Sequence, residues 1–114
     1  MRVLVIGAGV TGANVLKQLQ KNPAIEIVTA DPRQEHHAVK EGIIDKVDIH
    51  EVLTPLTLKT VLDRTRPDLV LLAMAAEDMG LGKAPGIEIL ADALKQEISA
   101  LSMVPVIEVT RVRR

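Results

Sequence analysis

Residues 3–19 read VLVIGAGVTGANVLKQL and pass from an aliphatic run through three glycines into a helical pattern. The aliphatic run predicts a strand that ends at Gly7, and the apolar residues that recur every third position from Val10 predict a helix with one apolar face. Glycine costs about 0.5–1 kcal/mol relative to alanine inside regular structure, so its use at Gly7, Gly9 and Gly12 needs a reason. The spacing indicates either a tight turn or a ligand that approaches the backbone.

The alternation of strand and helix continues beyond this stretch. Residues 69–75 (LVLLAMA) are continuously apolar, which is typical of a strand that is buried on both faces. Strands that alternate with helices pair in parallel through right-handed crossovers. The predicted strands are 2–6, 25–30, 46–50, 69–75 and 104–109. Four helices are predicted between them: one that starts at Val10, one over about 33–41, one that starts at Thr54-Pro55, and one over 87–101.

Two of the predicted strands belong at the edges of the sheet. Pro105 has no backbone N–H to donate, which places the strand 104–109 at one edge. The polar alternation of 46–50 (KVDIH) places that strand at the other edge. The fold class predicted is α/β, a three-layer, doubly wound, five-stranded parallel sheet with the strand order 3-2-1-4-5.

The composition predicts one globular domain over residues 1–114, of which 47% are hydrophobic. No apolar run reaches the roughly 20 residues that span a bilayer, so we expect no insertion into a membrane. The N-terminus enters a strand directly, and we therefore expect no signal peptide. The chain has no cysteine, which excludes disulfides and fits a cytoplasmic location.

Several functions are disfavoured by the residues that are rare or missing. The net charge is −1, with 14 basic and 15 acidic residues mixed along the chain, so we expect no binding to nucleic acid. The chain has no aromatic residue to stack on a base and no tyrosine to act as a general acid. His36, His37 and His50 are expected at the surface, and no metal site and no catalytic residue is predicted.

The glycines have the spacing G-x-G-x-x-G between a predicted strand and a predicted helix, and this context gives each a mechanical role. Gly7 allows the turn off the strand, Gly9 lets a pyrophosphate lie against the backbone, and Gly12 permits close packing of the helix on the strand. The helix N-terminus offers backbone N–H groups to an anion. Asp31 ends the second strand, where a carboxylate accepts hydrogen bonds from ribose hydroxyls.

VLVIGAGVTGANVLKQL together with VTAD (28–31) resembles the NAD-binding half of Rossmann dehydrogenases. It is most similar to the nucleotide lobes of saccharopine-dehydrogenase-like enzymes and to the regulatory domains of potassium-uptake systems. The resemblance implies that Gly7, Gly9, Val10, Thr11 and Gly12 line the diphosphate, that Asp31 holds the adenosine ribose, and that Ala73 and Met74 border the nucleotide. Residues 53–75 also resemble sugar-nucleotide epimerases, but in fold alone, because those enzymes need a tyrosine.

The cofactor expected from this resemblance is NAD. NADP is less favoured because Asp31 would repel its 2′-phosphate, although Arg33 tempers that preference, since arginine is the residue that NADP sites use. We expect a single-domain NAD(H)-binding protein that serves as a regulatory, sensing or nucleotide-lobe subunit. The alternative is an oxidoreductase whose active site is completed by oligomerisation or by a partner substrate domain, with the loop 77–86 as a candidate contributor.

The last expectation concerns assembly. The chain ends where a Rossmann domain normally continues, and the apolar stretch 104–109 (VPVIEV) then leaves a sheet edge that proteins usually hide or pair. The helix 87–101 keeps an apolar face of its own. We therefore expect a homodimer built from the C-terminal half, with two-fold symmetry.

Overall fold

A computed structural model describes residues 1–33, 36–50 and 55–73 and, further along, 103–109. Between residues 73 and 103 it describes only the single positions 86, 89, 93, 96, 97, 99 and 100. The predicted helix 87–101 therefore lies largely outside the described residues, and Met74 and most of the loop 77–86 lie outside them as well.

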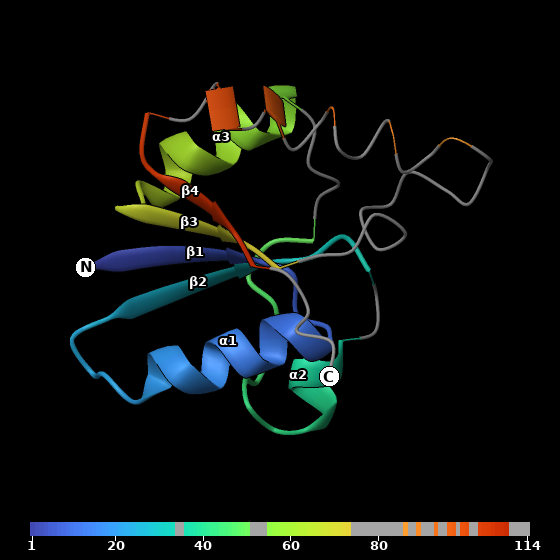
Figure 1. Ribbon diagram of the computed structural model, residues 1–114. Coiled ribbons are helices and arrows are strands. Elements are labelled where there is room, and N and C mark those ends of the chain that lie inside the picture. Colours follow the sequence, from blue (N-terminus) through green and yellow to red (C-terminus); the bar gives the residue numbers. More distant parts are fainter. Residues whose placement is uncertain are drawn as a thin grey trace.

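Four parallel strands form the sheet (Figure 1), in the order β2-β1-β3-β4. Their bounds are β1 Arg2–Ile6, β2 Glu26–Ala30, β3 Leu69–Leu72 and β4 Val106–Glu108. The two most apolar strands, β1 and β3, lie inside, and β4 lies at an edge, as the position of Pro105 predicted. Because all the pairings are parallel, the carboxyl ends of the strands share one edge of the sheet.

The predicted strand 46–50 does not form as a strand. Ile49 makes a single parallel bridge to Ala30, so it lies beside the end of β2 but does not continue into a ladder of backbone hydrogen bonds. Asp48 explains the interruption, because its Oδ2 accepts the Thr29 N–H at 2.9 Å, the donor that a continuing ladder would need. The sheet has four strands in the described part of the chain, and the five-stranded order 3-2-1-4-5 is not confirmed.

Helices cover both faces of the sheet, which gives the three layers that were predicted. α1 (Val10–Gln20) and α2 (His37–Lys40) lie on one face and α3 (Pro55–Thr65) lies on the other (Figure 1). α2 is shorter than the predicted helix 33–41 and begins only at His37. None of the helices that the structure describes is long and apolar enough to cross a membrane.

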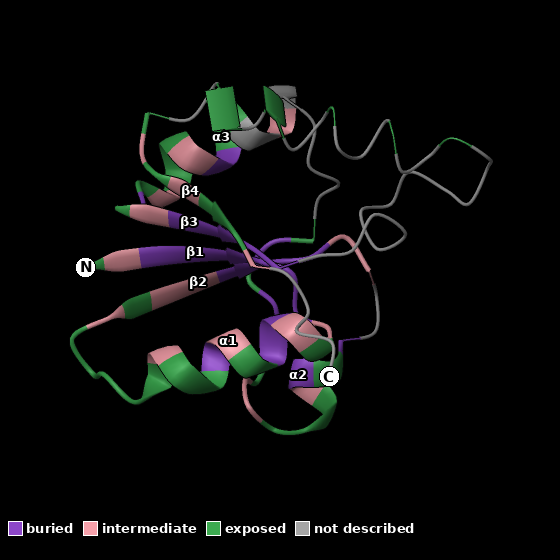
Figure 2. Ribbon diagram, in the orientation of Figure 1, coloured by how far each residue is buried: buried purple, intermediate pink, exposed green. Residues whose placement is uncertain are grey.

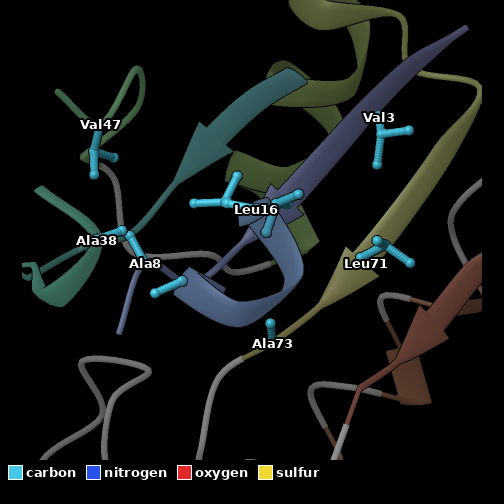
Figure 3. Packing of buried hydrophobic residues seen from close by; sticks show 9 residues of the cluster. Val3, Ala8, Leu16, Ala38, Val47, Leu71 and Ala73 are labelled. Atoms are coloured by element: carbon cyan, nitrogen blue, oxygen red, sulfur yellow. The ribbon is translucent and has the colours of Figure 1, made fainter. Parts of the chain in front are cut away.

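The core consists of two aliphatic clusters, one on each face of the sheet. Alternate residues of β1 enter different clusters, with Leu4 packing on the α3 side and Val5 on the α1 side. Both are fully buried, and Figure 2 shows most of β1 in the buried class. In the second cluster Leu16 of α1 packs on the sheet, while Ala8 lies beside Ala38 of α2 (Figure 3). This packing fixes the turn after β1 against both helices.

Candidate functional site

The turn between β1 and α1 has a backbone that only glycine adopts readily. Gly7 has φ 117°, in the region where a side chain clashes with its own backbone. Its N–H donates to the carbonyl of Ala30 over 2.7 Å, which extends the contact between β1 and β2 by one residue. The role that the sequence predicted for Gly7, a tight turn at the end of the first strand, agrees with this geometry.

Gly12 lies where the first turn of α1 presses against the end of β1. A Cβ built on Gly12 would lie 2.0 Å from the carbonyl oxygen of Gly7 and 2.5 Å from its carbonyl carbon. These are backbone atoms, so they cannot move aside cheaply. Gly12 thus permits the close approach of helix and strand, as the spacing predicted.

The N-terminus of α1 opens at the carboxyl edge of the sheet. Gly9 is its N-cap residue and supplies no side-chain cap, and the first turn contains no acidic residue. The first backbone N–H groups of a helix have no partner within the helix, and they carry the positive end of its dipole. Val10 is exposed and Thr11 is half-buried, so part of this end of the helix reaches solvent. The arrangement suits an anionic ligand.

Asp31 follows β2 and has a completely buried side chain. Its Oδ2 accepts the Ala8 N–H at 2.8 Å and Arg33 Nη2 at 2.6 Å. Its Oδ1 accepts the Arg33 N–H at 2.9 Å and Arg33 Nε at 3.0 Å. Burial raises the pKa of Asp31, but the hydrogen bonds from the Arg33 side chain and from the two backbone N–H groups, with the charge of Arg33, outweigh burial and leave the pKa below its ordinary value. The carboxylate is therefore a buried anion that ties the glycine turn to β2.

Arg33 covers the outer side of the same turn. A Cβ built on Gly9 would lie 2.8 Å from Nη2 of Arg33 and 3.3 Å from Nη1. The arginine side chain is 30% exposed and forms a two-pronged ion pair with Asp31. The space above Gly9 that was predicted for a pyrophosphate thus contains a guanidinium in this structure.

His36 corrects an expectation, because it is buried rather than at the surface. Its side chain is 4% exposed, and Nε2 lies 3.9 Å from Oδ1 of Asp31. Nε2 has no hydrogen-bond partner among the described residues. The ring lies 5.3 Å from that of His50, which is exposed like His37. His36 is the N-cap residue of the short helix α2 and has an extended backbone, and its side chain makes no cap hydrogen bond.

Ala73 lies at the carboxyl end of β3, on the same edge of the sheet as the glycine turn. It is buried, and its N–H donates to the carbonyl of Ile6 over 2.8 Å. Ala73 and Ala8 belong to one core cluster, so the structure brings this predicted site residue to the turn. Met74 lies outside the described residues. The part of the chain that is described holds no group of three histidine or acidic residues that could bind a metal ion.

Comparison with known proteins gives matches in structure alone, because no family model and no curated protein matches the sequence. The apo saccharopine dehydrogenase (L-Glu forming) from Saccharomyces cerevisiae superposes with a TM-score of 0.64 at 16% identity, over 98% of this chain and 22% of that one. The fold is Rossmann-like. A UDP-glucose 4-epimerase from Thermus thermophilus, crystallised with NAD, superposes with a TM-score of 0.54 at 21% identity, over 89% of this chain and 30% of that one.

Both matches agree with the resemblances that the sequence suggested, at the level of fold. This Rossmann-like chain spans less than a third of the length of each of these two proteins. The resemblance to potassium-uptake regulatory domains stays a prediction.

Sequence reasoning placed the glycines well and missed what surrounds Asp31. It assigned Asp31 to a ligand, whereas the carboxylate accepts hydrogen bonds from the backbone N–H groups of Ala8 and Arg33. The available signal was the spacing Asp-x-Arg directly after a strand, which allows an acid and a base to pair within one turn. The burial of His36 had no comparable signal, because His36 and His37 are adjacent and chemically identical.

Proposed function

We propose that this chain binds an adenine dinucleotide, NAD or NADH, against the glycine turn formed by residues 7–12. The observation that carries the proposal is the approach of Gly12 to the Gly7 carbonyl, which sets the uncapped N-terminus of α1 directly after β1, at the carboxyl edge of the sheet. In doubly wound folds a ligand binds outside the carboxyl ends of the strands, with its pyrophosphate at the helix N-terminus. The NAD held by the similar epimerase supports this class of ligand.

In this proposal each residue of the site has one role. The backbone of Gly7 and of Gly9–Gly12 lines the diphosphate, and Asp31 accepts hydrogen bonds from the adenosine ribose. Ala73 and Met74 border the nucleotide. Asp31 favours NAD over NADP because its lowered pKa keeps it negative near neutral pH, and a negative charge repels a 2′-phosphate.

The biological role that we propose is that of a cytoplasmic regulatory, sensing or nucleotide-lobe subunit, and we propose that it acts as a homodimer. The alternative is an oxidoreductase completed by a partner substrate domain. That alternative is supported by the two similar structures, which are enzymes with much longer chains. Both roles require the dinucleotide to bind, so binding is the first property to test.

Titration with NADH, followed by its own fluorescence, tests the proposal directly, because the chain has no Trp or Tyr that would contribute protein emission. The variant Gly9→Val should lose binding, because its side chain enters the space of the diphosphate. The fold should persist, since the atoms nearest to a Cβ at Gly9 are the far end of the flexible Arg33 side chain. Ala24→Val, in an exposed turn, is the control.

Three outcomes would count against the proposal or part of it. If wild type binds none of NAD, NADH, NADP or NADPH at millimolar concentration in calorimetry, the proposal fails. If Gly9→Val binds as tightly as wild type, the ligand lies elsewhere. If NADP binds more tightly than NAD, Arg33 and not Asp31 determines the choice of cofactor.

A further inference from the structure

The carboxylate that should receive the ribose has no accessible oxygen in the ligand-free protein. Asp31 is 0% exposed, and each of its oxygens accepts two hydrogen bonds from within the chain. A ribose hydroxyl must come within about 2.5–3.0 Å of a carboxylate oxygen to donate to it. Some donor that now occupies Asp31 therefore has to leave before the sugar can bind.

The four donors to Asp31 are of two kinds. Two are backbone N–H groups, from Ala8 and Arg33, which are fixed by the glycine turn and by the turn after β2. The other two are Nε and Nη2 of the Arg33 side chain, which is partly exposed to solvent. The side chain can swing outward without moving the backbone, so the guanidinium is the group that can leave.

The same guanidinium also covers the part of the candidate site that is proposed for the diphosphate. Nη2, which bonds Asp31 at 2.6 Å, lies 2.8 Å from the position of a Cβ on Gly9. A diphosphate that lies against the backbone of Gly9 requires this volume. One displacement of Arg33 would therefore uncover the ribose acceptor and the diphosphate cradle together.

We propose that Arg33 competes with the dinucleotide for Asp31 and keeps the ligand-free site closed. This inference rests on the proposed function and adds to it the residue that sets the affinity. On binding, the ribose hydroxyls donate to the oxygens that Nε and Nη2 release, while the backbone N–H groups of Ala8 and Arg33 keep their bonds. The observed dissociation constant is then larger than the intrinsic constant, because only the open fraction of the protein can bind.

The variant Arg33→Ala tests this competition. It removes the guanidinium and leaves both backbone donors on Asp31, so the carboxylate keeps partners and gains access to water. We expect NADH to bind about tenfold more tightly than to wild type, as it would if about one molecule in ten were open in wild type. Arg64→Ala, an exposed position on α3 on the opposite face of the sheet, should leave the affinity unchanged.

A second variant separates competition from simple charge attraction. Arg33→Lys keeps the positive charge but cannot donate to both carboxylate oxygens through a planar fork. If Arg33 competes, affinities for NADH rise from wild type through Arg33→Lys to Arg33→Ala. If Arg33 instead attracts the diphosphate, Arg33→Ala binds more weakly than wild type, and the inference is overturned. Equal affinities of all three proteins would overturn it as well.

The unfolding temperature gives a readout that does not depend on fluorescence. Without ligand, Arg33→Ala should unfold at a lower temperature than wild type, because the ion pair stabilises the closed form. With saturating NADH, the rise in unfolding temperature should be larger for Arg33→Ala than for wild type. If NADH binds wild type, and binds Arg33→Lys and Arg33→Ala progressively more tightly, both proposals stand. If wild type, Arg33→Lys and Arg33→Ala all fail to bind, the proposed function fails with this inference, whereas binding without the predicted order of affinities rejects the competition alone.

Discussion

The backbone N–H of Ala8 donates a hydrogen bond to Oδ2 of Asp31 over 2.8 Å, and this bond joins the glycine turn after β1 to the end of β2. Both residues are fully buried. A buried carboxylate is tolerated only when hydrogen bonds and opposite charge replace the water that it loses. Here two backbone N–H groups and Arg33 supply that replacement, so Asp31 shapes the candidate site before any ligand arrives.

The first prediction concerns the stability that Asp31 provides. Asp31→Asn removes the charge and sets an amide N–H₂ group against donors from Ala8 or Arg33. We expect the free energy of unfolding to fall by about 2–3 kcal/mol, in line with the loss of a hydrogen-bonded buried charge. Urea denaturation measures the loss, and Asp63→Asn on the exposed side of α3 is the control. A loss below about 0.5 kcal/mol, the low end for one ordinary hydrogen bond, would contradict this role for the carboxylate.

The second prediction concerns acid. Because the folded-state pKa of Asp31 lies below the ordinary aspartate value, the group stabilises the fold fully above the unfolded pKa and loses that contribution as the pH falls through the folded pKa. The free energy of unfolding should therefore drop as the pH decreases below about 4, the ordinary pKa of aspartate. Asp31→Asn should show a shallower drop over the same range. Parallel pH profiles for the two proteins would be inconsistent with a lowered pKa.

The third prediction concerns Gly12. Gly12→Ala places a methyl group 2.0 Å from the carbonyl oxygen of Gly7, so α1 has to move away from β1. We expect a loss of about 3 kcal/mol or more, at the upper end of the range for overpacked cores. Asn14→Ala, at an exposed position of the same helix, should change stability by about 0.5 kcal/mol at most, as most surface substitutions do. An equal effect of the two substitutions would show that the close approach does not matter.

The fourth prediction tests the proposed homodimer. Ile107 of the edge strand β4 is 51% exposed, and Met103 just before the strand is 99% exposed. Exposed apolar side chains at a sheet edge favour pairing with a second copy, and no further strand pairs with β4 among the described residues. Light scattering at micromolar concentration should give twice the chain mass of 12.3 kDa for wild type and the single mass for Ile107→Lys. A wild-type mass near 12.3 kDa throughout a dilution series would end the dimer proposal.

The sequence was sufficient to predict the structure where burial or backbone geometry permits only one arrangement. The apolar runs of β1 and β3 required the interior of a parallel sheet, and Pro105 required an edge. The tight turn at Gly7 and the close packing at Gly12 were predicted correctly, because a positive φ at the first and a contact with backbone atoms at the second admit no side chain. Such constraints act within a few residues and can be recognised in one short motif.

The remaining features depend on contacts between side chains that local patterns do not contain. The predicted strand 46–50 does not form because the carboxylate of Asp48 accepts the hydrogen bond from the N–H of Thr29. The alternation of KVDIH does not indicate that contact. The position of Arg33 on Gly9 depends on a turn that follows β2. The sequence therefore predicted where a ligand would lie and did not reveal that a side chain of the chain itself lies there.

The most direct test of dinucleotide binding is an amide proton–nitrogen correlation spectrum recorded during titration with NAD. We predict saturable shifts concentrated on the backbone amides of the glycine turn, residues 7–12, and on Arg33, because the ligand replaces the guanidinium there. The amides of α3, on the opposite face of the sheet, should stay in place. The absence of any shift at millimolar NAD, or saturable shifts confined to α3, would contradict the account.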